Sequence, residues 1–393
     1  NNNLKKIVLF RNRGLGRWLL TNYHNMYKDL DNKRGTNTLL LSGTSWSPKS
    51  YSYHIEADVN AILNGNEEEV KAIEKSEFKF KYTLINNKPV EVSGTDLEIR
   101  IEKIKSIVTD LIKKSGRVKK SKIELEIENL EEGRKKVLLV VGSYDEARTL
   151  KQYLDTILNN DGTITRDNVV ALVRDDDEAS DEYISRGDVI EFGTMDKKVL
   201  IAPLMALERG YNILNENNKA AIGSVYFLAR PMPIPNDLSI VISKINSEAM
   251  RKLKYKNSKN ISEHTKWVKD NRDESLRYMQ TLLVKSERLG YKQLDVRSRE
   301  ALCMTLFVTI CQIVGRLIRG GCKAKVYFCD AKFAPNTVFD EEDTETTSIL
   351  VGIIRTLEKL MKSEDLIERE IANKLYYPFY KGLKECGGLK YGK

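Results

Sequence analysis

Short runs of β-branched and aliphatic residues alternate with stretches of helical periodicity along much of this chain. Each run is predominantly apolar and is followed by a turn signal or a helix start. Strands that are apolar on both faces are typical of a parallel sheet covered by helices. The runs predicted as strands are Thr38–Leu41, Lys136–Val141, Asn168–Val173, Lys198–Ala202, Ser224–Leu228 and Lys325–Cys329. We therefore predict an α/β fold with a parallel sheet and helices on both of its faces.

Several segments between these runs have the spacing of amphipathic helices. Ser143 and Glu146 form a capping-box pattern, which predicts a helix from there to about Leu158. Leu97–Lys114 carries an apolar stripe, and a long helix is predicted from about Asp295 to Arg319. We expect two closing helices within 346–386 and a charged helical insertion at 237–290.

Charge and composition narrow the class of protein. The chain has 393 residues, 31% of them charged, and a net charge of +9, which permits binding to phosphate backbones without proving it. No apolar run approaches the roughly 20 residues of a membrane helix, and residues 1–13 do not form a secretory leader, so we expect a cytoplasmic protein without a membrane partner. Five cysteines without a C-x-x-C pair and three scattered histidines predict no metal site.

Opposite charge runs follow the predicted helix at 97–114. Lys113–Lys122 is strongly basic and Glu124–Glu132 is strongly acidic. Charge runs of this kind are usually solvated. We therefore predict a solvated helical hairpin or loop here.

Gln312, Gly315, Arg316 and Arg319 fall at the end of the helix predicted at 295–319. Gln312, Arg316 and Arg319 are four and three residues apart, so they share one helix face. A glycine inside a helix costs about 1 kcal/mol relative to alanine, so Gly315 indicates that a ligand or another backbone approaches closely. Arginine forks neutralise charge on a transferred phosphoryl group. The alternative, a helix with solvated arginines, explains neither the glycine nor the glutamine.

The pattern Q-x-x-G-R-x-x-R formed by these residues is similar to motif VI of superfamily-two helicases, and the chain resembles the DinG/XPD (Rad3-like) group most closely. Further segments resemble motifs of that group in the same order. They are LLLSGT (39–44, motif III), VLLVVGSY (137–144, motif IV), VLIAPLMALERGYNI (199–213, motif V), LARPMPIPND (228–237) and GRLIRGGCKAKVYFCDAKF (315–333). LLLSGTSW and PMPIP also resemble helicases encoded beside prokaryotic Piwi–endonuclease genes.

The chain departs from the group's pattern in the residues that contact ribose and nucleic acid, and in one larger respect. The departures are Gly43 for alanine, Pro203 for threonine, Asn212 for an acidic residue and Lys332 for arginine. More important, the sequence contains no G-x-x-x-x-G-K-[ST] and no Asp-Glu pair before Ser42. The resemblance implies that these elements belong to a first RecA-like domain, upstream or on another polypeptide.

The resemblance implies both a domain organisation and a mechanism. A helical lead-in at 1–32 would precede a RecA-like helicase domain at 33–336, with insertions at about 95–135 and 237–292, and a helical extension at 337–393 would follow. The chain would be the second motor domain of an ATP-dependent helicase or translocase acting on single-stranded nucleic acid, with DNA expected. ATP and Mg²⁺ would be held mainly by the first domain. Individual roles follow for the residues of motifs V and VI: Arg316 and Arg319 as arginine fingers, Gln312 orienting water or phosphate, and Gly315, Glu208, Arg209 and Gly210 beside the nucleotide.

Residues after two predicted strands would bind or sense the nucleic acid. Ser143 and Tyr144 open a helix whose free amides suit a phosphate. Ser42 and Thr44 would couple the cleft to the strand-binding surface, or would simply form a turn. Ligands of parallel sheets bind at the carboxyl ends of strands, which is where Ser42–Thr44, Gly142–Tyr144, Pro203 and Asp330 fall.

Two other functions stay open from the sequence. A motor-like domain can serve as a non-catalytic scaffold or binding module in a defence or repair complex, and the missing phosphate loop suits that role. A different nucleotide-dependent enzyme on the same kind of sheet is the third possibility, because a fold does not determine a function.

Overall fold

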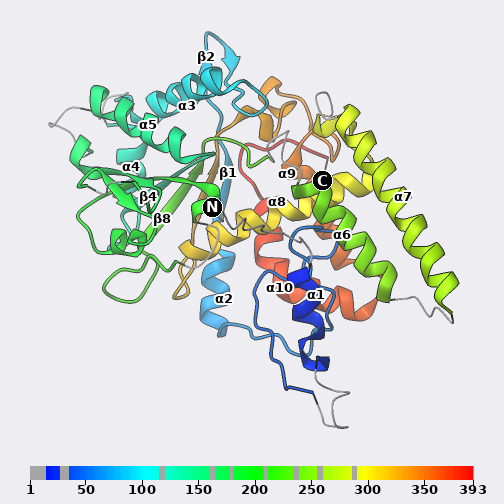
Figure 1. Ribbon diagram of the computed structural model, residues 1–393. Coiled ribbons are helices and arrows are strands. Elements are labelled where there is room, and N and C mark those ends of the chain that lie inside the picture. The colour runs from blue at the N-terminus through cyan, green and yellow to red at the C-terminus, as the bar shows by residue number, and fades with distance from the viewer. Residues whose placement is uncertain are drawn as a thin grey trace, which may run out of the picture. The chain divides into compact units, whose positions relative to one another are not determined.

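The computed structural model of the chain describes residues 15–26, 35–114, 120–158, 164–177, 180–207, 211–232, 239–254, 260–285 and 290–392 (Figure 1). The chain forms two compact units. The helical unit comprises Asn1–Asn60 and Pro233–Gly290, and the sheet unit comprises Ala61–Met232 and Tyr291–Lys393.

The helical unit contains α1 (Leu15–Asn22), the short 3-10 helix η1 (Tyr23–Asn25), α6 (Ser239–Lys254) and α7 (Ile261–Lys285). Arg17 of α1 donates to the backbone carbonyls of Tyr51 and Ser52, at 3.0 and 2.7 Å. Lys252 of α6 forms an ion pair of 2.6 Å with Glu274 of α7. The helices predicted at 237–290 are thus confirmed as α6 and α7.

The strand predicted at Thr38–Leu41 is wrong. These residues form no strand and no backbone hydrogen bond within the described part of the chain. Leu39 is 81% exposed and Leu41 is 75% exposed. The apolar sequence suits a buried strand, but a strand forms only where a neighbouring strand supplies backbone partners.

The sheet unit is built on a seven-stranded sheet whose adjacent strands are all parallel. Its order is β1-β9-β8-β4-β7-β5-β6. The strands are β1 (Glu77–Phe80), β4 (Lys136–Val141), β5 (Val169–Val173), β6 (Tyr183–Ser185), β7 (Val199–Pro203), β8 (Ile222–Phe227) and β9 (Lys325–Phe328). Five of the predicted strands are therefore confirmed, as β4, β5, β7, β8 and β9. The edge strands β1 and β6 were not predicted, because their sequences are short and partly charged.

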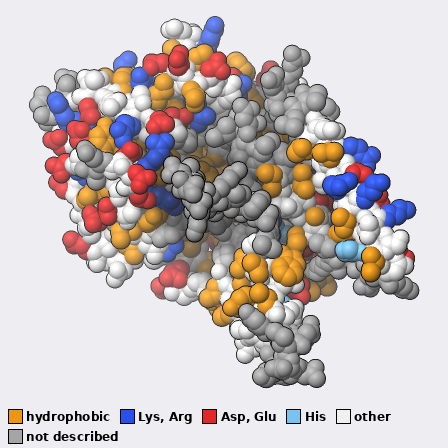
Figure 2. Space-filling view, in the orientation of Figure 1, with side chains coloured by type: hydrophobic (Ala, Val, Ile, Leu, Met, Phe, Trp, Pro, Cys, Tyr) orange, Lys and Arg blue, Asp and Glu red, His pale blue; other side chains and the backbone are white. Residues whose placement is uncertain are grey.

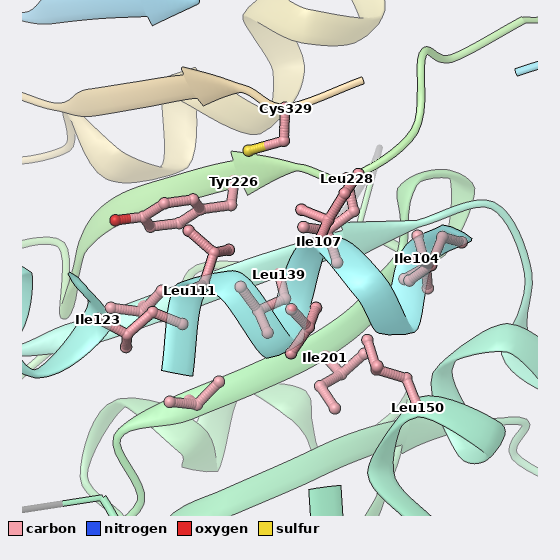
Figure 3. Packing of buried hydrophobic residues seen from close by; sticks show 14 of the residues in the cluster. Ile104, Ile107, Leu111, Ile123, Leu139, Leu150, Ile201, Tyr226, Leu228 and Cys329 are labelled. Atoms are coloured by element: carbon pink, nitrogen blue, oxygen red, sulfur yellow. The ribbon is translucent and has the colours of Figure 1, made fainter. Parts of the chain in front are cut away.

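Three helices cover one face of this sheet: α3 (Leu97–Ile112), α4 (Lys122–Glu128) and α5 (Tyr144–Ile157). Alternate residues of β4 point to this face, as the period of a strand requires. Figure 3 shows Ile107 of α3 and Leu150 of α5 among the buried residues around Leu139 of β4 and Ile201 of β7. The predicted helices at 97–114 and after Ser143 are confirmed, and they belong to the main hydrophobic core.

The solvated hairpin predicted at 113–132 is wrong in its second half. Ile123 and Ile127 of α4 are only 1% and 3% exposed and join the core around β4. Glu124 and Glu126 are also buried: Glu124 accepts the Ser121 amide at 2.7 Å, and Glu126 accepts the Tyr327 hydroxyl at 2.8 Å. The acidic run therefore contains a helix, α4, and the burial of its apolar residues packs it against the sheet.

The other face carries α8 (Val296–Leu317), α9 (Ile349–Met361) and α10 (Leu366–Lys384). α8 packs on β8 and on α9, and α10 packs on α9, on β1 and on α2 (Glu67–Glu74). Phe307 of α8 meets Tyr376 and Phe379 of α10 edge to face, with centroids 5.1 and 6.2 Å apart. The long helix and the two closing helices are confirmed, and with them the predicted α/β class.

Smaller elements complete the sheet unit. β2 (Leu84–Ile85) and β3 (Lys88–Pro89) form an antiparallel hairpin. The 3-10 helices are η2 (Arg166–Asn168), η3 (Val189–Gly193), η4 (Leu204–Ala206), η5 (Tyr291–Gln293), η6 (Ala331–Phe333) and η7 (Thr337–Phe339).

α8 is the only helix of the described segments that is long and apolar enough to cross a membrane. The expectation from the sequence concerns uninterrupted apolar runs, and α8 reaches this length as a helix with charged residues near its start. Its apolar window has a mean hydropathy of 1.5, but 78% of that window is buried inside the protein. Burial of this extent is typical of a core helix, so α8 is weak support for a span.

Candidate functional site

α8 ends at the amino-terminal edge of the sheet, and one buried side chain holds it there. Arg134 is 3% exposed and its guanidinium donates only to backbone carbonyls and to Glu131. The carbonyls belong to Ala220 (2.9 Å), Ile222 (3.2 Å), Leu317 (2.6 Å) and Lys323 (2.8 Å). The sequence did not single out Arg134, because it lies in a charged run that looks solvated, and only burial shows its role.

Arg316 lies one residue before the end of α8 and is only 5% exposed. Its Nε donates to the carbonyl of Leu207 at 2.5 Å, and its Nη1 donates to the carbonyl of Tyr211. These two carbonyls flank residues 208–210, so Arg316 closes the loop that follows η4. The predicted nucleotide contacts Glu208, Arg209 and Gly210 lie outside the described residues.

Burial, together with the nearby positive charge of Arg319, lowers the pKa of the Arg316 guanidinium to about 10. The group therefore stays charged at neutral pH, with two carbonyl oxygens as its partners. A guanidinium in this state binds its own chain rather than an outside phosphate. The prediction that Arg316 reaches across a cleft does not match its position in this chain.

Arg319 is placed differently. It follows the end of α8, its side chain is exposed, and no hydrogen bond or ion pair of that side chain occurs within the described residues. Its backbone carbonyl accepts from the amide of Ala220 at 3.1 Å, which fixes the backbone beside the start of β8. Arg319 thus combines a held backbone with a guanidinium that is accessible to a ligand.

Gly315 leaves open space on the surface of α8. A Cβ atom added to it would have no atom within 4 Å among the described residues. Gln312, one turn earlier, is half-buried. Among the segments that the structure describes, no backbone therefore makes the close approach that the glycine predicts.

Ser143 caps α5 as predicted, and its hydroxyl accepts the amide of Glu146 at 3.1 Å. Glu146 accepts the amide of Gly142 at 2.6 Å and forms an ion pair of 2.8 Å with Arg100. The prediction of free amides after Ser143 is wrong for the Glu146 amide, because the Ser143 hydroxyl already accepts it.

Tyr144 lies at the carboxyl end of β4 within a group of aromatic and basic side chains. Arg174, after β5, stacks over the Tyr144 ring with its guanidinium carbon 5.3 Å from the centroid. Arg186, after β6, stacks in the same way over Tyr211 at 5.7 Å. Arg186 and Tyr211 also act electrostatically on the Tyr144 hydroxyl. Tyr211 therefore joins this group to Arg316, which holds the Tyr211 carbonyl.

Asp330, predicted at the same edge, has a structural role. It is fully buried and accepts hydrogen bonds from the Val92 amide at 2.9 Å and from the amide and hydroxyl of Ser93. It also accepts from the amide of Arg230 at 3.1 Å. Its lone pairs are used to join three segments of the sheet unit, so it is closed to a ligand.

Ser42 and Thr44 belong to the helical unit, whereas the other predicted site residues belong to the sheet unit. The Ser42 hydroxyl accepts the amides of Thr44 and Ser45 at 3.3 and 3.0 Å. This arrangement is a serine turn. It matches the simpler of the two roles predicted for these residues.

Charge on the visible face of the sheet unit is mixed. Figure 2 shows Lys and Arg side chains interspersed with Asp and Glu, without a continuous basic track on that face. Within the described ranges, no three His, Cys, Asp or Glu side chains gather as a metal site. The residues described here fit a phosphate through their guanidinium groups, but they offer no ligand set for Mg²⁺.

No protein-family model matches the chain, and no curated protein matches its sequence. The functional argument therefore depends on the motifs and on the geometry of the sheet unit.

Proposed function

We propose that the chain is the second motor domain of an ATP-dependent helicase or translocase that acts on single-stranded nucleic acid. One observation carries the proposal: α8 ends with an accessible guanidinium, Arg319, directly beside a buried one, Arg316, that closes the loop after η4. The sequence resemblance assigns this helix end and this loop to the same nucleotide pocket. Their contact supports that assignment.

The two arginines have different tasks in this proposal. Arg319 neutralises charge on the terminal phosphate of ATP, which is bound with Mg²⁺ on a first RecA-like domain. Arg316 holds the backbone at Leu207 and Tyr211 beside the same nucleotide. Gln312 lies on the same helix face one turn away and orients the phosphate or the attacking water. The chain's own contribution is charge neutralisation, because it lacks the phosphate-loop lysine and the metal-binding carboxylate.

The exposed segment Thr38–Leu41 supports a partner domain. Its leucines have the sequence of a buried strand, yet they are exposed and lack strand partners in the described chain. Exposed apolar segments with free backbone groups are sites where another chain or domain adds. A parallel sheet in the first domain would satisfy these groups.

The proposal is tested by ATP hydrolysis of this chain together with its phosphate-loop domain, in one polypeptide or in trans, with and without single-stranded DNA. Arg319→Ala is expected to lower turnover by about a thousandfold or more, the size of an arginine-finger effect, with ATP binding retained. The matched control is Arg297→Ala, since Arg297 is an exposed arginine at the opposite end of the same helix. Normal turnover of Arg319→Ala would remove the basis for the assignment.

The scaffold function is the second candidate, and the burial of Arg316 favours it. A guanidinium committed to two carbonyls of its own chain serves folding whether or not ATP is hydrolysed. This alternative predicts that no phosphate-loop domain accompanies the chain. It also predicts that Arg316→Ala lowers stability while Arg319→Ala changes nothing.

A further inference from the structure

Three arginines at the carboxyl edge of the sheet unit stack on tyrosines, but they differ in charge compensation. Arg148 stacks over Tyr183 at 5.6 Å and forms an ion pair with Asp177 at 3.1 Å. Arg174 stacks over Tyr144 and lies 3.4 Å from a carboxylate oxygen of Asp145. Arg186 stacks over Tyr211 and has no carboxylate partner within the described residues.

Of these three arginines, Arg186 also makes the fewest hydrogen bonds and ion pairs with its guanidinium among the described residues. It is half-buried, and its Nε is buried without a hydrogen-bond partner among the described residues. A buried donor without a partner costs about 1–3 kcal/mol, so such a group calls for a ligand or another explanation. The ring of Tyr211 below it holds the guanidinium plane without consuming its donors.

Tyr144 supplies a neutral hydroxyl to the same space. Burial raises the pKa of Tyr144, and the negative charge of Asp175 raises it further, against the opposing effect of Arg186. The hydroxyl therefore stays protonated at neutral pH and can donate a hydrogen bond. Tyr211 lies close enough to Tyr144 to act on it electrostatically, so the two rings and the guanidinium converge from three separate segments.

We propose that Arg186, with Tyr144 and Tyr211, forms a phosphate-binding site at the carboxyl edge of the sheet. The planar guanidinium fork matches a phosphate, which would complete its unused donors and supply the missing negative charge. The phosphate belongs either to the backbone of a single strand or to a nucleotide. Only the first source rests on the proposed function, and the chemistry of the site is the same for both.

The test measures binding of a labelled single-stranded oligonucleotide to the 393-residue chain by fluorescence anisotropy over a range of salt. Arg186→Ala is expected to lower the affinity about tenfold and to reduce the slope of log affinity against log salt by about one phosphate contact. Arg148→Ala is the matched control, since it removes an equal charge from a stacked arginine that already has a carboxylate partner, Asp177, and whose ring partner, Tyr183, is not part of the site. It is expected to change the affinity less than twofold.

A second substitution is expected to have the opposite effect on oligonucleotide binding. Asp175 accepts the amide of Gly187 at 2.9 Å and places a negative charge near Tyr144. Asp175→Asn keeps an acceptor and removes the charge, so it is expected to strengthen oligonucleotide binding about threefold. Circular dichroism and thermal melting of each variant check that the sheet unit stays folded.

Titrations with ATP and with inorganic pyrophosphate distinguish the two sources. Loss of oligonucleotide binding alone in Arg186→Ala assigns the site to a strand phosphate, and loss of ATP or pyrophosphate binding alone assigns it to a nucleotide. Equal effects of Arg186→Ala and Arg148→Ala, or no effect of either, overturn the site. The proposed function fails separately, through normal ATP hydrolysis by Arg319→Ala.

Discussion

Several basic side chains of the sheet unit donate to backbone carbonyls, among them Arg134, Arg316 and Lys136. Arg134 ties the end of α8 to the starts of β8 and β9, Arg316 closes the loop after η4, and Lys136 donates to Met195 and Lys197 at 2.5 and 2.7 Å. Each of these side chains donates to backbone carbonyls that have no amide partner in their loops, where water would otherwise bind. The net charge of +9 therefore overstates the positive charge available to a nucleic acid.

The burial of the Lys136 ammonium group against backbone carbonyls can be tested through the pH dependence of stability. Burial lowers the pKa of Lys136 from 10.5 to about 8, and Asp196 only partly opposes this. The unfolded chain therefore binds more protons than the folded one between about pH 8 and 10.5, so stability rises with pH there. We compare the free energies of unfolding of the wild type and of Lys136→Met. We expect the wild-type value to rise, relative to that of the variant, by about 1 kcal/mol from pH 8 to pH 10, after allowance for partial exposure of the side chain.

Urea denaturation at a series of pH values measures this difference. Lys135→Met is the control, because Lys135 is the neighbouring lysine and forms a surface ion pair with Glu132 instead of donating to backbone carbonyls. A level difference for Lys136→Met would contradict the burial of the ammonium group.

At the scale of elements, α8 joins the core to the candidate site. Its apolar side chains pack under α9 and α10, its end is held by Arg134, and Arg319 projects from that end. Gly315 is the exception in this helix, since it weakens the helix and faces open space. Under the proposed function, this open surface is where the first motor domain approaches α8.

Gly315→Ala distinguishes the effect of the glycine on the stability of α8 from its effect on the approach of a partner domain. The substitution is expected to raise the free energy of unfolding by up to about 1 kcal/mol, because it removes the helix cost of glycine and meets no atom. ATP hydrolysis in the presence of the phosphate-loop domain is expected to fall, because the added methyl occupies the approach surface. Thermal melting and turnover measure the two effects.

Gly352 of α9 is the matched control for this change. A Cβ atom there would lie 2.1 Å from the Tyr291 hydroxyl and 2.7 Å from the Cys303 sulfur. Gly352→Ala is therefore expected to destabilise the protein. Unchanged hydrolysis in Gly315→Ala would show that nothing packs on this face of α8.

At the scale of the whole molecule, the chain divides into a unit built around a complete parallel sheet and a helical unit that contains an unpaired strand-like segment. The seven strands of the parallel sheet pair with one another. Thr38–Leu41 has no such strand partner among the described residues, and its leucines expose apolar surface to solvent. Stability is expected to differ accordingly between these parts.

Hydrogen exchange tests this difference directly. The amides of Thr38–Leu41 are expected to exchange at the rate of an unstructured peptide in the chain alone, whereas those of β4 stay protected. Addition of the phosphate-loop domain is expected to slow exchange at Thr38–Leu41. Protection of this segment in the chain alone would contradict its exposed position, and no change on addition would contradict its role as a joining strand.

The candidate site was predictable only in part. The motifs correctly located the end of α8 and the start of α5, because helix spacing and caps are local properties of sequence. The distinction between Arg316 and Arg319 was not predictable, since burial of one and exposure of the other depend on the path of the loop after η4. Arg186 gave no signal at all, because a tyrosine 25 residues later in the chain makes its contact.

The sequence by itself determined the class of fold, five of the seven strands and, α4 excepted, the helices that cover the sheet, because apolar period and capping act over a few neighbouring residues. Only the tertiary structure decided which apolar runs become strands and which charged groups remain available. Thr38–Leu41 lacks the neighbour that a strand requires, and Arg316 is taken up by carbonyls more than one hundred residues away in the chain. Pairing and burial are long-range properties, and no local pattern contains them.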